Sequence, residues 1–270
     1  MTLDVVARDG LVLLGCGKMG SALQAGWLKA GVPPASVWVI EPNPTDWLRE
    51  TGVHLNKGVP PAPAVALLAV KPQMMGAALP SLQALGNGST LFVSIAAGTS
   101  IASFEAVLGD KTPIVRTMPN TPAMVGRGIT GICANAFAGA KGLDLARDLM
   151  RAVGEVVDLD GEHQIDAVTG VSGSGPAYVF HLIEAMAQAG EAQGLSADTA
   201  MKLARATVCG AGELAFQSTD TAAQLRINVT SPGGTTAAAL AVLMNPESGF
   251  PPLLTKAVKA AADRGRELGK

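Results

Sequence analysis

Charged and aromatic residues are scarce in this sequence of 270 residues. Charged residues make up 16% of the chain and aromatic residues 4%, and the formal net charge is -2. A chain so close to neutral has no strongly basic surface of the kind that binds a nucleic-acid backbone or an anionic membrane. We therefore expect a small-molecule partner, with no nucleic acid and no membrane.

Cysteine and histidine are also rare and dispersed. The residues of these two types are Cys16, Cys133, Cys209, His54, His163 and His181. An odd number of widely separated cysteines argues against a disulfide framework and fits a reducing compartment. Since the histidines form no ligand cluster with the cysteines, we expect no metal site.

Targeting signals and long apolar runs are missing from the pattern as well. The segment from Met1 to Gly10 lacks the basic start and the apolar stretch of a secretory signal. No apolar run approaches the roughly 18 residues expected of a membrane-spanning helix. These absences predict a cytoplasmic protein.

Aliphatic residues are abundant instead, since hydrophobic residues make up 48% of the chain. Together with the low charge fraction, this predicts that some apolar surface is buried between subunits. The chain is longer than the roughly 100 to 200 residues of one ordinary domain. We expect two domains, at residues 1–163 and 164–270.

The first of these expected domains alternates short β-rich runs with helix-compatible stretches, the pattern of βαβ units and a parallel sheet. The strands are expected at Leu11–Leu14, Ser36–Ile40, Ala64–Val70, Thr90–Ile95, Ile114–Arg116, Ile129–Ala134 and Glu155–Leu159. Two of the expected helices are Ser21–Ala30 and Gln73–Leu85. The predicted class is α/β.

After His163 the strand signal stops, and the sequence is typical of helices separated by Gly, Ser and Pro. An apolar stripe that includes Val179 and Met186 predicts an amphipathic helix. The segment Ala197–Phe216 is rich in Ala and Gly, which favours close approach of another helix. A final helix is expected at Leu253–Leu268.

Gly15, Gly17 and Gly20 form a G-x-G-x-x-G motif between an expected strand and an expected helix. The first glycine permits a tight turn, the second lets the backbone approach a pyrophosphate, and the third allows close helix–strand packing. The start of the helix adds free N–H groups and a positive dipole. In this context the motif predicts dinucleotide binding.

The identity of the dinucleotide depends on the end of the second strand. Glu41 stands where an acid accepts the ribose hydroxyls, which favours NADH, but it is equally typical of a solvated strand end. Asn43 could instead hydrogen-bond a 2′-phosphate, which would favour NADPH. The residues leave the choice between NADP and NAD open.

Further motifs follow the glycine loop in a fixed order. They are AVKP at 69–72, SIAAG at 94–98, RTMPNTP at 116–122, VSGSGPAY at 171–178 and VTSPGGTT at 229–236. In order and spacing the sequence resembles the pyrroline-5-carboxylate reductase family from the glycine loop almost to the C-terminus. The resemblance implies a Rossmann-type domain followed by an all-α C-terminal dimerisation domain. It also implies an NAD(P)H-dependent oxidoreductase that reduces the C=N bond of 1-pyrroline-5-carboxylate to L-proline, the last step of proline biosynthesis.

The resemblance also implies the site residues. For the cofactor they are Leu14, Gly15, Cys16, Gly17, Lys18, Met19, Gly20, Asn56, Ala69, Val70, Lys71, Pro72, Ala96, Ala97, Gly98 and Asn120, to which the motif reasoning adds Glu41 and Asn43. For the substrate they are Ser231, Gly233, Gly234, Thr235 and Thr236. Thr236 matches the hydroxyl near the imine and is the expected catalytic residue. The family's C-terminal domains imply a homodimer, which can assemble into a larger ring.

Structural interpretations compete with several of these assignments. Lys71 could be a solvated loop charge, and SGSGPAY and SPGGTT could be helix caps alone. The stretch before Val229 also departs from the family pattern, which has a Lys-Asp pair there. Arg226 retains the positive charge of that pair, but Ile227 stands in place of the acidic residue.

Two other functions share the glycine loop. A β-hydroxyacid dehydrogenase would need a catalytic lysine early in the helix after SGSGP, where this sequence has AYVFHLIEAM. A dinucleotide sensor without turnover is the other, and the intact SPGGTT segment argues against it.

Overall fold

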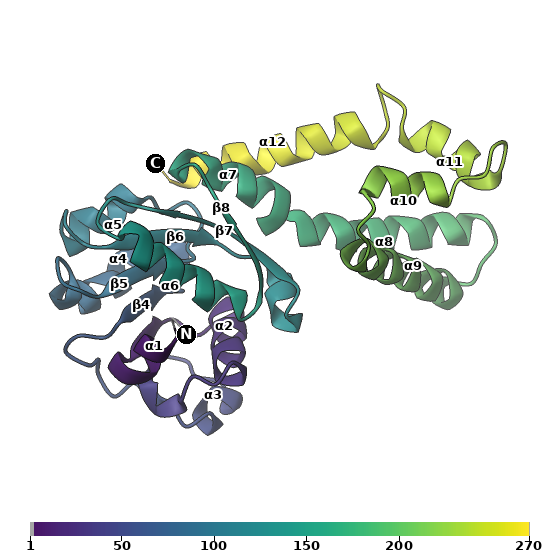
Figure 1. Ribbon diagram of the computed structural model, residues 1–270. Coiled ribbons are helices and arrows are strands. Elements are labelled where there is room, and N and C mark those ends of the chain that lie inside the picture. The colour runs from purple at the N-terminus through teal and green to yellow at the C-terminus, as the bar shows by residue number, and fades with distance from the viewer. Residues whose placement is uncertain (1–2, 270) are drawn as a thin grey trace. The chain divides into compact units, whose positions relative to one another are not determined.

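The computed structural model describes residues 3–269 and divides the chain into two compact units (Figure 1). The first unit runs to Gly173 and includes the chain again from Ala261 onward, while the second unit is Ser174–Ala260. The first two residues and the last residue of the expected domains lie outside the described residues. The domain boundary expected after residue 163 lies earlier in the chain than the division at Gly173. Between the two positions, a short helix α7 (Ile165–Val168) and a π-helical turn (Thr169–Gly173) still belong to the sheet unit.

The first unit is built on one eight-stranded sheet. Its strands are β1 (Leu11–Leu14), β2 (Val37–Ile40), β3 (His54–Leu55), β4 (Val65–Leu68), β5 (Leu91–Ser94), β6 (Ile114–Met118), β7 (Gly128–Ala134) and β8 (Gly154–Asp158). They lie in the order β3-β2-β1-β4-β5-β6-β7-β8. The strands from β1 to β6 are parallel, which confirms the predicted Rossmann-type arrangement.

Strand β7 pairs antiparallel with β6, so the last two strands run against the others. The reason lies in the connection, which consists of residues 119–127 and contains only a 3-10 turn at Thr121–Val125. A parallel crossover needs about a dozen residues or more, usually including an α-helix. The sequence predicted a parallel sheet, and the short PNTP connection explains the exception.

Helices cover both faces of the sheet. They are α1 (Asp4–Asp9), α2 (Lys18–Lys29), α3 (Asp46–Glu50), α4 (Pro72–Ala78), α5 (Ile101–Leu108) and α6 (Gly139–Arg151). Successive residues of β1 point to opposite faces, as strand geometry requires. Leu11 and Leu13 join the core under α1, α2 and α6, whereas Val12 and Leu14 join the core under α4 and α5.

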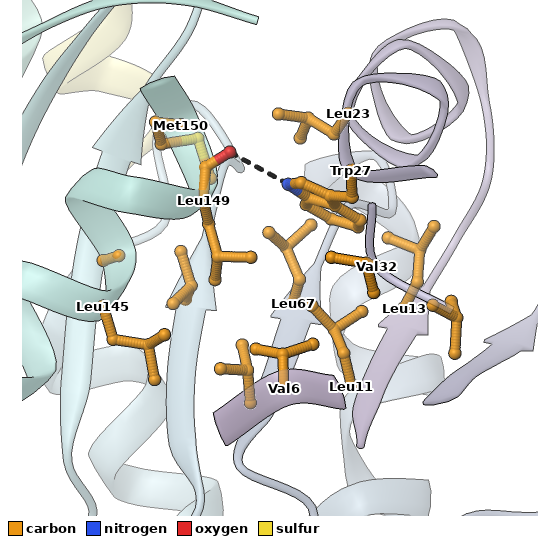
Figure 2. Close-up of a cluster of buried hydrophobic side chains, with 14 of the residues drawn as sticks. Val6, Leu11, Leu13, Leu23, Trp27, Val32, Leu67, Leu145, Leu149 and Met150 are labelled. Atoms are coloured by element: carbon orange, nitrogen blue, oxygen red, sulfur yellow. Dashed lines mark hydrogen bonds between the residues drawn. The ribbon is translucent and has the colours of Figure 1, made fainter. Parts of the chain in front are cut away.

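A hydrogen bond from one buried indole connects α2 and α6 in the core that contains Leu11 and Leu13. Trp27 of α2 is fully buried, and its Nε1 donates a hydrogen bond of 2.9 Å to the carbonyl oxygen of Leu149 in α6 (Figure 2). Leu23 and Met150 flank this contact in the same cluster. Because a buried indole N–H needs a partner, the hydrogen bond fixes how α2 and α6 meet.

Three predicted helices differ in their bounds, and the last of them begins at Phe250 rather than Leu253. Helix α2 begins at Lys18 rather than Ser21, because the glycine loop itself turns into the first helical turn with Gly17 as N-cap. The stretch expected as one helix from Gln73 to Leu85 changes to a 3-10 helix at Leu79, next to Pro80, whose ring cannot continue an α-helical hydrogen-bond ladder.

The second unit contains helices only among its described elements, as predicted. They are α8 (Gly175–Ala192), α9 (Ala197–Gln217), α10 (Ala222–Asn228) and α11 (Thr235–Leu243), and α12 (Phe250–Leu268) begins here and ends in the first unit. Pro176 lies in the first turn of α8, where a missing N–H is tolerated. None of the helices described in residues 3–269 could span a membrane.

Helices α8 and α9 meet through small side chains. Ala187, Ala200 and Ala204 form a buried cluster with Ile183, and a Cβ atom at Gly190 would lie 3.2 Å from that of Ala200. Ala204 therefore packs against α8 of its own chain, which its position in the helix alone did not determine. Ala211, further along α9, is exposed in the single chain.

Large apolar side chains remain exposed along the second unit. They include Val179, Phe180, Met186, Leu203, Leu214, Phe216 and Val242. Helix α8 thus buries its apolar stripe only in part within one chain. An apolar surface of this extent is typical of a subunit interface.

Trp27 provides the test of the first core. Trp27→Phe should lower the free energy of unfolding by about 2 to 4 kcal/mol, because it shrinks a packed side chain and leaves the Leu149 carbonyl without its donor. Urea unfolding at one fixed protein concentration measures the change. The control Trp47→Phe alters an indole that is 41% exposed and should change stability by less than about 0.5 kcal/mol. Equal midpoints for the two variants would contradict this role of Trp27.

Candidate dinucleotide and substrate site

Six loops follow the carboxyl ends of neighbouring strands in the first unit, where open α/β sheets bind ligands. The glycine loop follows β1, Glu41–Asn43 follows β2 and Asn56 follows β3. Residues 69–72 follow β4, residues 96–98 come soon after β5, and Asn120 follows β6. The sheet order therefore brings every predicted cofactor residue to one edge of the sheet.

The three glycines of the loop meet three different surroundings. Gly15 has φ +89, and a Cβ atom there would lie 2.9 Å from the backbone nitrogen of Val70. A Cβ at Gly20 would lie 2.6 Å from the carbonyl oxygen of Gly15, whereas one at Gly17 would meet nothing within 4 Å. The first and third glycines are thus required by the protein itself. The second leaves an open face at the start of α2, which fits an approaching pyrophosphate.

Glu41 is held by backbone groups on both sides. Its Oε2 accepts a hydrogen bond of 2.8 Å from the Cys16 amide, and its Oε1 accepts one of 2.9 Å from the Asn43 amide. The side chain is therefore oriented rather than loosely solvated. Each carboxylate oxygen has a second lone pair, so Glu41 can still accept a ribose hydroxyl.

Asn56 completes this arrangement from the next strand. Its Oδ1 accepts the Glu41 amide at 2.9 Å, and its Nδ2 donates to the Glu41 carbonyl at 2.8 Å. The residue has a left-handed φ of 53, which asparagine tolerates better than most residues. The Asn56 side chain thus holds the Glu41 backbone at the end of β2.

A cavity of about 460 Å³ opens beside the glycine loop. Cys16, Gly17, Lys18, Glu41 and Asn43 line it, all of them predicted cofactor residues. Thr45, Trp47 and Met124 also line it, and the sequence did not single them out. The only sequence signal for any of these three residues was Thr45 as a possible helix N-cap. The structure shows this cap, because the Thr45 hydroxyl accepts the Leu48 amide at 3.3 Å.

Cys16 takes part in the site through its backbone amide and not through a thiolate. The side chain is buried, and its Sγ lies 3.2 Å from Oε1 of Gln24. Burial raises the pKa of the Cys16 thiol, and the nearby Glu41 charge raises it further. The thiol is therefore neutral at pH 7 and places no negative charge beside the start of α2.

The loops after β4 and β5 are closely fixed to their neighbours. The Ala69 amide donates to the Leu14 carbonyl at 2.8 Å, and Pro72 opens α4 just after the exposed Lys71. Ala96 and Gly98 are buried, and a Cβ at Gly98 would lie 2.9 Å from the Cβ of Leu268 at the end of α12. That end of α12 belongs to the first unit.

Asn120 has a structural contact in the first unit. It is 8% exposed, and its Oδ1 accepts the Ile129 amide at 3.0 Å, which closes the PNTP loop onto β7.

Among residues 3–269 no group of three or more His, Cys, Asp or Glu side chains is arranged to hold a metal ion.

The predicted substrate residues lie together at the start of α11 in the second unit. Gly234 is the N-cap of α11, and its amide donates to the Ser231 carbonyl at 3.0 Å. Gly233 has φ +70, which turns the chain into the helix. Ser231 and Thr235 are exposed and Thr236 is half-buried. A nine-residue helix with an open glycine turn at its start can accept a carboxylate.

Two protein-family models match this chain. Residues 162–268 match the dimerisation domain of pyrroline-5-carboxylate reductase. Residues 11–98 match a family described as coenzyme F420-dependent NADP oxidoreductase. The first match covers the helical region, and the second covers the glycine loop and the loops after β2, β3, β4 and β5.

Known proteins are similar over almost the full length. A pyrroline-5-carboxylate reductase of Pseudomonas aeruginosa is 42% identical over 266 residues, which cover 96% of this chain and 97% of that protein. The solved structure of such an enzyme from Coxiella burnetii is 35% identical with a TM-score of 0.89, covering 97% of this chain and 99% of that one. The pyrroline carboxylate reductase of Plasmodium falciparum, solved with NADP bound, is 30% identical with a TM-score of 0.83 and the same coverage.

The glycine loop yields a prediction that separates folding from binding. Gly15→Ala should destabilise the protein by about 2 kcal/mol or more, because alanine is strained at this φ and crowds Val70. Gly17→Ala should unfold like the unaltered protein yet weaken dinucleotide binding about tenfold, since its methyl group projects toward the ligand. Thermal unfolding and calorimetric titration with NADPH and NADH measure the two effects.

Gly76→Ala is the matched control, because a Cβ there also meets nothing within 4 Å and the residue lies inside α4. It should leave dinucleotide binding unchanged. If Gly17→Ala binds both dinucleotides normally, the pyrophosphate does not approach this face.

Proposed function

The chain belongs to the pyrroline-5-carboxylate reductase family, and on that basis we propose that it transfers a hydride from NADPH or NADH to the C=N bond of 1-pyrroline-5-carboxylate, giving L-proline. This is an oxidoreductase reaction, and it is the last step of proline biosynthesis. The proposal assigns the cofactor to the edge loops of the first unit and the substrate to the start of α11.

One observation supports the proposal, namely that both helix starts to which we assign the ligands have an open glycine in this chain. A Cβ atom at Gly17, at the start of α2, or at Gly233, just before α11, would meet nothing within 4 Å. A dinucleotide sensor would need only the first of these. The second supports a carboxylate-bearing substrate and therefore turnover.

The residues at the sheet edge fit a nicotinamide dinucleotide. The first turn of α2 offers amides without intrahelical acceptors for the pyrophosphate, and Lys18 adds a positive charge nearby. Glu41 and Asn43 face the cavity where the adenosine ribose would lie. When bound, the reduced nicotinamide supplies the hydride. We assign Ala69–Pro72, Ala96–Gly98 and Asn120 to the walls that orient it.

The start of α11 would orient the imine. The amides of Thr235 and Thr236, in the first turn of α11, hold the carboxylate, helped by the Ser231 and Thr235 hydroxyls. The Thr236 hydroxyl hydrogen-bonds the ring nitrogen, which carries a proton before the hydride reaches the adjacent carbon. The nitrogen then ends as the neutral amine of proline, so the charge at this atom falls during the reaction. No ionised side chain is required for this step.

The helix after SGSGP supports this reaction over the dehydrogenase alternative. Helix α8 reads GPAYVFHLIEAMAQAGEA and contains no lysine that could serve as the acid and base of a β-hydroxyacid dehydrogenase. Lys71 is exposed at the start of α4, and we propose that it helps organise that loop rather than acting as an acid.

We propose a homodimer formed through the helical region at residues 164–270, with a larger ring of dimers as the further assembly. The match of residues 162–268 to a dimerisation domain and the exposed apolar side chains support the dimer. We also place the enzyme in the cytoplasm, where its three free cysteines would stay reduced.

The experiment that tests the function follows cofactor oxidation by purified protein with and without the imine. We expect oxidation of NADPH or NADH that depends on 1-pyrroline-5-carboxylate, with proline formed in equal amount. Folded protein that binds the cofactor yet forms no proline with either dinucleotide would refute the proposed reaction.

Thr236 is the side chain most closely tied to the chemistry. Thr236→Val keeps the shape of the residue but removes the hydroxyl, and kcat should fall by about 100-fold. Thr255→Val is the control, because that hydroxyl donates to the Pro251 carbonyl within α12. A near-normal kcat for Thr236→Val would remove Thr236 from the mechanism.

Glu41 should set the choice of dinucleotide. Glu41→Ser removes a negative charge beside the expected position of a 2′-phosphate, so the kcat/KM ratio of NADPH to NADH should rise by about tenfold. The control Glu50→Ser removes an exposed charge at the end of α3 and should leave the ratio unchanged. An unchanged ratio in Glu41→Ser would show that Glu41 does not meet the ribose.

Two alanines on α9 separate assembly from folding. Ala211→Arg should dissociate the dimer in light scattering while the helix content stays normal, because Ala211 is exposed in the single chain. Ala204→Arg should instead unfold the α8–α9 pair, because Ala204 is only 4% exposed. Lys202→Arg, also exposed on α9, is the control. A fully active monomer of the unaltered protein would contradict the dimer.

A further inference from the structure

Arg116 is a buried cation at the edge where the cofactor loops begin. It lies on β6 opposite Ser94, at the carboxyl end of β5, and only 6% of its side chain is exposed. Its Nη1 donates to Oε1 of Glu162 at 2.7 Å. The two residues are 46 positions apart in the sequence. A buried guanidinium without such a partner would be strongly unfavourable.

The same oxygen of Glu162 also holds the end of a cofactor loop. Oε1 accepts a hydrogen bond of 2.7 Å from the amide of Ile101, the first residue of α5. The loop that contains Ala96–Gly98 enters α5 at this point. Its other end is fixed at Ser94, whose carbonyl accepts from the Thr117 hydroxyl at 2.9 Å and whose Oγ accepts from the Ala96 amide at 3.2 Å.

Cys133, which lies near Arg116, cannot replace Glu162 as its anionic partner. Cys133 lies opposite Arg116 on β7, and burial raises the pKa of its thiol to about 11, so it is neutral at pH 7. The Nε of Arg116 is buried and has no hydrogen-bond partner among residues 3–269. An ion pair with one nitrogen unsatisfied is a poor source of stability compared with apolar packing. The geometry of the pair therefore points to positioning.

We propose that Arg116 and Glu162 form a positioning pair that sets the loop Ile95–Ser100 against the nicotinamide end of the cofactor. Arg116 fixes the Glu162 carboxylate from the β5 end of the loop, and the carboxylate fixes the amide at the α5 end. Neither residue touches the reacting atoms. This inference rests on the proposed cofactor site, and it assigns roles to two residues outside the predicted set.

Direct binding of NADPH and NADH to the full-length protein tests the pair. Glu162→Ala removes both contacts of the carboxylate, and the Kd of each dinucleotide should rise by about tenfold. Glu162→Gln keeps an oxygen for the Ile101 amide but loses the charge, and each Kd should rise by about threefold. The two dinucleotides should shift by the same factor, because the nicotinamide end is common to both.

Asp158→Asn is the matched control. It weakens an ion pair with Arg147 at 3.0 Å in the same unit, where the Asp158 side chain is 55% exposed, so both Kd values should stay unchanged. Thermal unfolding of every variant separates lost stability from lost affinity. A folded Glu162→Ala with unchanged Kd values overturns the proposal. If that variant fails to fold, an unchanged Kd in Glu162→Gln overturns it.

The binding measurement needs no imine. Protein that binds NADPH but forms no proline would refute the reaction and still let the Kd values decide the role of the pair. Unaltered protein that binds neither dinucleotide would overturn the cofactor site and the pair with it. A shift confined to NADPH would place the effect at the 2′-phosphate and also overturn the proposed role.

Discussion

The turn at Gly15 is the constraint on which the candidate site depends. Its left-handed φ brings the backbone against Val70, so that the loops after β1 and β4 touch. Backbone hydrogen bonds from Gly15 to Ile40 and from Ala69 to Leu14 extend this contact to the end of β2. Any side chain at position 15 would separate these strand ends. The closeness of the three loops depends on one missing Cβ atom.

The site that results relies on backbone groups and helix starts more than on ionised side chains. Glu41 orients the Cys16 amide, Asn56 orients Glu41, and Glu162 holds the first amide of α5. The carboxylates of Glu41 and Glu162 thus act on the main chain. A reaction that needs orientation of two ligands, and no ionised general acid or base, is well served by such a framework.

The sequence predicted the features that depend on local chemistry. The positions of seven of the eight strands, the tight turn at Gly15, the close packing at Gly20 and Pro176 at a helix start all follow from backbone rules that act over a few residues. The two-residue strand β3 was not predicted. The antiparallel β7 could also have been inferred, because the connection at residues 119–127 is too short for a crossover. Five of the six strand ends that carry predicted cofactor residues follow expected strands, and the sixth, at Asn56, follows β3, which was not expected.

Features that depend on distant side chains were beyond the sequence. Glu41 could have pointed to solvent, and only the fold brings its carboxylate to the Cys16 amide. Ala204 and Ala211 look alike in a small-residue helix, yet only Ala204 is buried against α8. The pair of Arg116 and Glu162 joins two segments through tertiary packing alone. The most direct test of the whole account is proline formation with NADPH or NADH deuterated on the transferred face of the nicotinamide, followed by mass spectrometry. We predict one deuterium on the ring carbon that was double-bonded to nitrogen, whereas proline without deuterium there would contradict direct hydride transfer.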